Sequence, residues 1–237
     1  MRRILMTLGA ALIAAACSSQ KQAAKVDDSG LARLNEAQME PVDEARVEEG
    51  RSQDALSRAR ANEADARSRL EVAKSERGVA DAQLKRAQAE RDLLKKQYAD
   101  KDKMAAVDQE IAGAQDRIRA TDLKLQYMQQ MIGVAEAERR LAESHVHTAR
   151  AMTERAKYRA MKAGNAPQAE SVNAGEVDQR VAEAEGQEAN LRREVAQRRS
   201  GAVDLYNRWQ QADARARTLA RPSTLSVPPP TGEPTSN

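Results

Sequence analysis

The sequence predicts an all-α protein in which long coiled-coil helices fold back on each other as an antiparallel hairpin. Three observations lead to this prediction. The chain of 237 residues has no Phe and only 2% aromatic residues, whereas 32% of its residues are Asp, Glu, Lys or Arg, so a thick globular core is not expected. Apolar residues recur with a seven-residue period. No proline occurs between Val42 and Ala163, as long uninterrupted helices require.

Charge patterning bears on possible partners. The formal net charge is only +3, and acidic and basic residues alternate along the predicted helices. There is no sustained basic stripe and no aromatic platform on which bases could stack, so a nucleic-acid partner is not expected. Acidic residues that precede a basic residue by four positions, as Glu63 precedes Arg67, instead indicate solvated helices, each pair contributing about 0.2–0.5 kcal/mol.

The first 17 residues have the layout of an export signal. Arg2 and Arg3 supply positive charge, residues 4–13 form an apolar run, and small residues lead into Cys17, the chain's only cysteine. The apolar run is too short to span a bilayer, which takes about 20 residues. Residues 1–16 are therefore expected to be a signal peptide, cleaved between Ala16 and Cys17.

The alanines that end at Cys17 resemble the lipobox of bacterial lipoproteins. The resemblance covers about the first twenty residues and departs from the family pattern at Ala14, where the family usually has Leu; ordinary signal peptidase would cut at the same bond without adding lipid. The resemblance implies that Cys17 becomes the acylated, palmitate-bearing N-terminus. Ser18, which is not Asp, then implies the outer membrane, facing the periplasm, with the cell surface as the alternative orientation.

Residues 17–41 are polar and weakly patterned, so they are expected to form a flexible tether. Pro41 suits the first turn of a helix, and a long helix is expected over 42–163. In the first half of this helix, alanine occupies the same seam position at every repeat, which buries little area and predicts a thin seam. The two seam positions hold Ala59, Ala66, Ala73, Ala80 and Ala87, and Leu56, Glu63, Leu70, Arg77, Leu84, Arg91 and Tyr98.

The second half of this segment has a stronger seam, displaced by one residue from the first. Its positions hold Met104, Ile111, Ile118, Leu125, Ile132, Arg139 and Val146, and Val107, Ala114, Thr121, Met128, Ala135, Ala142, Ala149 and Ala156. A kink or a turn at 99–103 explains the displacement. A kink leaves one rod about 180 Å long, against whose distal half the last helix folds; a turn gives a three-helix up-down-up bundle. Because no Gly or Pro marks 99–103, the rod is favoured.

Gly164 and Pro167 form a stop signal, which predicts a hairpin loop over 164–173. A return helix is expected over 174–221, with a heptad that includes Trp209. Pro222 ends it, and the proline-rich tail 222–237 is expected to be disordered. The loop 164–173 and the tail are the segments expected to be free to contact a partner.

No residues are expected to carry catalysis. His145 and His147 are two positions apart and point to different faces of a helix, so they cannot chelate one metal ion. There is no Gly-rich phosphate loop, GxSxG or HExxH, and an alanine seam offers no concave pocket for paired carboxylates. Enzyme activity, a metal, a cofactor and a small-molecule substrate are therefore not expected.

Two further groups of residues have alternative interpretations. Trp209, on the seam, is expected to plug the end of the hairpin; the functional alternative makes Tyr206 and Trp209 an aromatic anchor for a partner. Charged residues at seam positions are expected to be exposed to solvent, with a role in setting register as the alternative. These residues are Glu63, Arg77, Arg91, Arg139, Glu188 and Arg198.

The function expected from these features is that of a non-enzymatic outer-membrane lipoprotein. Its helical rod would act as a periplasmic spacer, scaffold or assembly factor in the cell envelope, held by the membrane through Cys17 and contacting a protein partner or a second copy of itself. The alternative is a periplasmic chaperone or adaptor that binds a client protein, which requires an exposed apolar strip.

Overall fold

The computed structural model describes residues 26–98 and 100–218. These residues form three long helices, α1 (Glu36–Lys96), α2 (Lys101–Ala163) and α3 (Ala174–Thr218), and two short 3₁₀ helices, η1 (Asp28–Arg33) and η2 (Pro167–Ser171). The described residues contain no strand. The predicted all-α class is confirmed.

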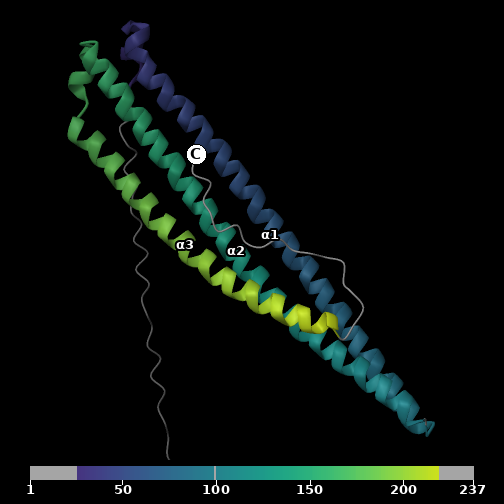
Figure 1. Cartoon of the computed structure of the whole chain (residues 1–237). Coiled ribbons are helices and arrows are strands. Elements are labelled where there is room, and N and C mark those ends of the chain that lie inside the picture. Colours follow the sequence, from purple (N-terminus) through teal and green to yellow (C-terminus); the bar gives the residue numbers. More distant parts are fainter. Residues whose placement is uncertain (1–25, 99, 219–237) are drawn as a thin grey trace, which may run out of the picture.

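The helices run up, down and up, with α2 packed against α1 on one side and against α3 on the other (Figure 1). The 63 residues of α2 span about 95 Å at about 1.5 Å per residue. One end of the bundle carries η1, η2 and the connection between α2 and α3; we call residues 26–34 and 164–173 the η end. The opposite end is the connection between α1 and α2, and we call residues 93–98 and 100–103 the hairpin tip. Because α3 has only 45 residues, it stops short of the hairpin tip (Figure 1).

The seam displacement at 99–103 corresponds to a turn, so the three-helix bundle replaces the favoured single rod. α1 ends at Lys96, α2 begins at Lys101, and Tyr98 adopts a φ of 49°. This left-handed conformation, which ends a helix and reverses the chain, is usually taken by Gly or Asn. The turn brings the two displaced seams face to face, as the contact between Arg91 and Asp108 shows.

The tether expected over 17–41 is structured from Val26 onward; residues 17–25 lie outside the described residues. α1 begins at Glu36, before the expected start at residue 42, because Asn35 and Gln38 form a capping box. In this box the backbone N–H of Asn35 donates to the side-chain oxygen of Gln38, and the backbone N–H of Gln38 donates to that of Asn35, both at 3.0 Å. Two N–H groups at the start of the helix, which have no carbonyl partner within it, are thereby hydrogen-bonded. Pro41 therefore lies inside the helix rather than in its first turn.

The buried positions of α1 and α2 follow the heptads read from the sequence. Ala73, Ala80 and Ala87 of α1 and Val107, Ala114, Met128, Ala135, Val146 and Ala149 of α2 are buried. α2 also buries a second face, which the heptads did not reveal. Tyr127 and Val134 on that helix form one apolar cluster with Ala202 and Trp209 of α3.

The second connection lies where the sequence placed it. Asn173 caps α3, because its side-chain oxygen accepts from the backbone N–H of Gly175 at 3.0 Å and of Glu176 at 3.4 Å. The α3 residues Val181, Glu188, Val195, Ala202, Trp209 and Ala216 are buried at their heptad spacing. The described residues of α3 end at Thr218, so the predicted helix end at 219–221 and the tail 222–237 lie outside the described residues.

Candidate functional site

The N-terminal segment packs on the η end of the bundle. Val26 and Leu31 are only 2% and 6% exposed, and they share an apolar cluster with Val42, Met161 and Ala166. These partners come from α1, α2 and the loop 164–173. Burying a Val or Leu side chain fully is worth about 1.5–3 kcal/mol, so the two apolar side chains hold this segment firmly against the three elements.

Ionic contacts add to this attachment. Lys157 of α2 is 6% exposed, and its Nζ lies 2.8 Å from Asp28 Oδ1 and 3.0 Å from Glu154 Oε1. The backbone N–H of Val26 donates to Glu154 Oε2 at 2.7 Å. Burial lowers the pKa of Lys157, but the hydrogen bonds to Asp28 and Glu154 outweigh burial and raise that pKa above its usual value. We call Val26, Asp28, Leu31, Glu154 and Lys157 the N-terminal latch.

Two glycines allow the close approach at the η end. A Cβ atom on Gly30 would lie 2.5 Å from the Sδ atom of Met161, and a Cβ atom on Gly164 would lie closer still to a methyl group of Leu34. Real Cβ contacts are not that short, so a larger residue at Gly30 would force Met161 to shift and one at Gly164 would force Leu34 to shift. The segment is thus fitted to the bundle.

The residues predicted for signal cleavage and lipidation, Ala16 and Cys17, lie outside the described residues. Eight residues, 18–25, separate Cys17 from Val26. The chain therefore passes from the predicted lipidation site to the N-terminal latch within a short stretch. The polar composition of 17–41 predicts a tether over both that stretch and the latch, and it does not indicate the latch.

The side chains of the charged seam residues, except that of Arg198, make polar contacts with a neighbouring helix. Glu63 of α1 is buried, and it accepts from Arg139 Nε of α2 at 2.7 Å while also pairing with Arg67. Arg77 Nε lies 2.5 Å from Asp122 Oδ1. The interpretation that these positions set register fits these contacts better than simple solvent exposure does. The half-buried Arg198 pairs with Glu194 on its own helix.

A second polar layer joins all three helices. Glu188 of α3 is buried; it lies 3.3 Å from His145 Nδ1 of α2 and also accepts from Thr148 and Arg192. His145 Nε2 lies 3.8 Å from Glu48 Oε1 of α1. Burial raises the pKa of Glu188, but the hydrogen bonds from Thr148, His145 and Arg192 outweigh burial and leave that pKa below its usual value.

The two histidines do not act together in this structure. His147 is exposed, whereas His145 contacts carboxylates of the neighbouring helices. Within residues 26–98 and 100–218, no group of three or more His, Cys, Asp or Glu side chains is arranged to hold a metal ion.

The aromatic residues of α3 pack against α2. Trp209 is 3% exposed and stacks on Tyr127, with ring centroids 5.8 Å apart and an interplanar angle of 15°. Tyr206 meets Tyr127 edge-on at 5.4 Å. Lys124 Nζ lies 5.6 Å from the centre of the Trp209 ring and 2.5 Å from Glu76 of α1. Trp209 is therefore buried on the seam as expected, but it packs on Tyr127 within α2 rather than at the end of the hairpin. Its burial leaves no exposed indole for a partner, and Tyr206 remains half-buried beside it.

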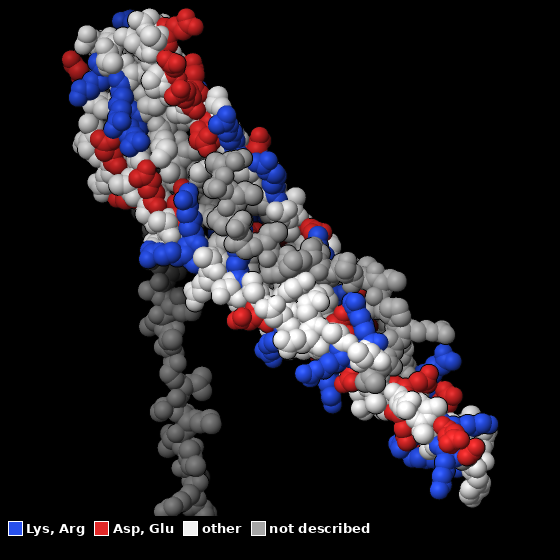
Figure 2. All heavy atoms as spheres, in the orientation of Figure 1, with Lys and Arg blue, Asp and Glu red and all other residues white. Residues whose placement is uncertain are grey.

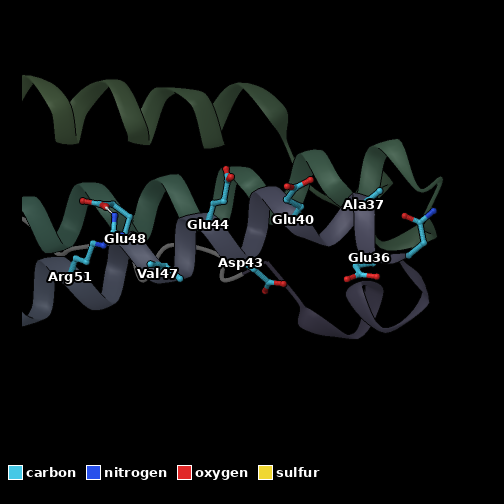
Figure 3. A pocket seen from close by; sticks show the side chains of 9 residues that line it. Glu36, Ala37, Glu40, Asp43, Glu44, Val47, Glu48 and Arg51 are labelled. Atoms are coloured by element: carbon cyan, nitrogen blue, oxygen red, sulfur yellow. Dashed lines mark hydrogen bonds and ion pairs between the residues drawn. The ribbon is translucent and has the colours of Figure 1, made fainter.

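A shallow groove follows the beginning of α1 (Figure 3). Its lining is strongly acidic and comes from one helix, and the side chain of Asp43 extends away from that of Glu44. The acidic residues are all exposed: Glu36, Glu40, Asp43, Glu44 and Glu48. Exposed carboxylates spread around one helix do not form the concave, partly dry site that separates the pKa values of a catalytic pair. This surface is a solvated acidic face.

Large apolar residues are exposed on the outer side of α1. Val72, Val79 and Leu93 each keep about half of their area exposed, and their spacings of seven and fourteen residues place them on one face. We call these three residues the α1 outer stripe. Tyr98 at the hairpin tip is 96% exposed. Figure 2 shows acidic and basic side chains interspersed along the visible face of the rod.

Comparison with protein-family models, with curated proteins and with solved structures gives no match for this chain. None of the helices described for residues 26–98 and 100–218 has the length and apolar character needed to cross a membrane.

Proposed function

We propose that this chain is a non-enzymatic bacterial outer-membrane lipoprotein whose three-helix rod serves as a spacer, scaffold or assembly factor in the cell envelope. Acylated Cys17 holds the protein on the membrane, and the rod faces the periplasm. The observation that carries the proposal is the N-terminal latch, because it connects the chain that follows Cys17 to one end of a rod about 95 Å long. An acyl anchor at Cys17 therefore tethers an extended body by its end.

The chemistry of the anchor supports stable residence at the membrane. Each buried CH₂ group of an acyl chain contributes about 0.8 kcal/mol, and one chain alone gives only marginal binding. A lipoprotein cysteine carries several acyl chains, so dissociation becomes very slow. The rod then needs no membrane-spanning helix of its own.

The character of the body supports a mechanical rather than a chemical role. Its interhelical contacts are a thin apolar seam and ion pairs such as that between Glu63 and Arg139. Its groove on α1 is open and acidic. Such a body extends over a long distance with little mass, which suits a spacer or a scaffold.

The test uses Cys17→Ala expressed in a bacterium with the lipoprotein pathway, with Ser19→Ala as the matched control. We expect the wild type and the control to incorporate labelled palmitate and to fractionate with the outer membrane, and globomycin to cause a larger precursor to accumulate. Cys17→Ala should lose both the label and the membrane fraction. An unchanged size and unchanged fractionation of Cys17→Ala would refute the lipid anchor.

The α1 outer stripe favours a second candidate, a periplasmic chaperone or adaptor that binds an apolar segment of a client protein. The measurement is suppression of aggregation of an unfolded outer-membrane protein by the purified chain. If the stripe binds clients, Val79→Lys abolishes the suppression and Ser57→Lys, which is exposed on α1 about 20 Å before the stripe, does not. Equal activity of both variants excludes the stripe as a client site, and a dimer that dissociates only in Val79→Lys assigns the stripe to self-association.

A further inference from the structure

We propose, resting on the lipid anchor proposed at Cys17, that the η end of the bundle faces the lipid bilayer and that the hairpin tip is the end held away from it. The sequence alone led to the opposite expectation for the loop 164–173, which it placed at the far end of a long rod, free to contact a partner. The structure brings this loop and the N-terminal segment to the same end (Figure 1).

The length of chain between the anchor and the bundle limits where the η end can be. Cys17 and Val26 are nine residue steps apart, and a fully extended chain spans at most about 3.3–3.6 Å per residue. Val26 therefore lies within about 30 Å of the bilayer surface that holds the acyl chains. The hairpin tip, about 95 Å further along the rod, reaches as far as about 125 Å from that surface.

The N-terminal latch keeps this limit short. Without the latch, the first residue held by the bundle would be Asn35, the cap of α1. The greatest distance that the chain from Cys17 can span would then double to about 60 Å. The latch prevents this because Val26 is bonded through its backbone to Glu154, and Lys157 pairs with Asp28. These contacts attach the chain that follows Cys17 to α2, at the end of α2 next to the loop 164–173.

The proposed orientation of the rod gives different surroundings to the loop 164–173 and to the hairpin tip. The loop 164–173 is crowded by the N-terminal segment, since Ala166 and Val172 pack with Leu31 and its neighbours. The hairpin tip carries Tyr98 and Leu93, which are exposed, and it extends beyond the end of α3. A partner located away from the bilayer therefore meets the hairpin tip first.

The experiment supplies the anchor chemically. The chain from Cys17 onward is coupled through its thiol to a maleimide lipid in vesicles of phosphatidylethanolamine and phosphatidylglycerol. A donor dye is attached through an azide-bearing residue at position 165 or at position 98, and energy transfer to acceptor-labelled lipid headgroups is measured. We expect strong transfer from position 165 and the loss of most of that transfer at position 98.

A latch variant and its control test the mechanism. Leu31→Ala combined with Lys157→Met should reduce transfer from position 165, because the longer connection to the anchor lets the η end move outward. Val203→Ala, on the exposed side of α3, should change nothing. Circular dichroism checks that each variant is folded. Equal transfer from both positions, or stronger transfer from position 98, overturns the proposed polarity. Because the anchor is synthetic, this result does not depend on whether cells acylate Cys17, which the palmitate experiment decides separately.

Discussion

Replacing Trp209 with alanine is the strongest single test of how α3 is held to the bundle. Trp209 is 3% exposed, stacks on Tyr127 and lies beneath the ammonium group of Lys124. Truncating a buried Trp to Ala typically costs about 3–5 kcal/mol, which combines lost transfer energy with the cavity left behind. We expect about 4 kcal/mol here, because the aromatic contacts with Tyr127 and Tyr206 are lost together with the buried area.

The assay is urea unfolding of the chain from residue 17 onward with Cys17→Ser, followed by circular dichroism. With a denaturant slope of about 2–3 kcal/mol/M, the expected loss lowers the midpoint by roughly 1.5 M. Hydrogen exchange should show that the second half of α3 loses protection first. Tyr98→Ala, which removes an exposed aromatic ring, is the matched control and should change the free energy of unfolding by less than about 0.5 kcal/mol. A loss below about 1 kcal/mol for Trp209→Ala, far less than the cost of truncating a buried Trp, would contradict the packing described for α3.

Three further predictions concern pH and glycine. The pKa of Glu188 is lowered in the folded chain. The stability that this carboxylate provides is therefore present above its unfolded pKa and is lost as the pH falls through the folded pKa. In urea unfolding at decreasing pH, the free energy of unfolding should depend less on pH for Glu188→Gln than for the wild type. Burial raises the pKa of Tyr127 from 10.0 to about 12. The contribution of the neutral phenol to the free energy of unfolding is therefore complete below pH 10 and is lost as the pH rises through about 12. Tyr127→Phe should reduce the destabilisation at alkaline pH, and ultraviolet absorbance of tyrosinate monitors the titration. Gly78 has open space where a Cβ would stand, so Gly78→Ala should raise the free energy of unfolding by about 0.8–1 kcal/mol. Gly30→Ala, whose Cβ would meet Met161, should instead speed hydrogen exchange of residues 26–34. Equal exchange rates of residues 26–34 in the two variants would argue against the close fit at the η end.

The sequence predicted the helices and their buried positions because heptad periodicity is a local property. Ala73, Ala80 and Ala87 are buried, and the seven-residue spacing alone places them on one face. The turn between α1 and α2 was not favoured because its left-handed residue is Tyr98 rather than Gly. Its conformation follows from the packing of two seams that are far apart along the chain, and the local sequence does not specify it.

The N-terminal latch could not be predicted for the same reason. Val26 and Glu154, which are 128 positions apart, share a hydrogen bond, and a short polar segment has no periodicity that reveals such a partner. The one signal available was the presence of large apolar residues, among them Val26 and Leu31, within a polar stretch. The second face of α2 escaped prediction because Lys124 and Thr148, which are buried, are residue types usually found on the surface.

The buried ion pairs explain how a thin alanine seam fixes a single register. A seam of alanines tolerates a slip of one heptad with little change in buried area, because alanine would still face small apolar residues. Such a slip would move Glu63 from Arg139 to Ile132 or Val146, the adjacent residues at the same seam position of α2. The buried Glu63 carboxylate would keep Arg67 but would face an apolar side chain in place of the Arg139 guanidinium, which disfavours the slipped register. The charged seam residues therefore exclude the alternative registers, and in doing so they fix the position of the hairpin tip relative to the η end.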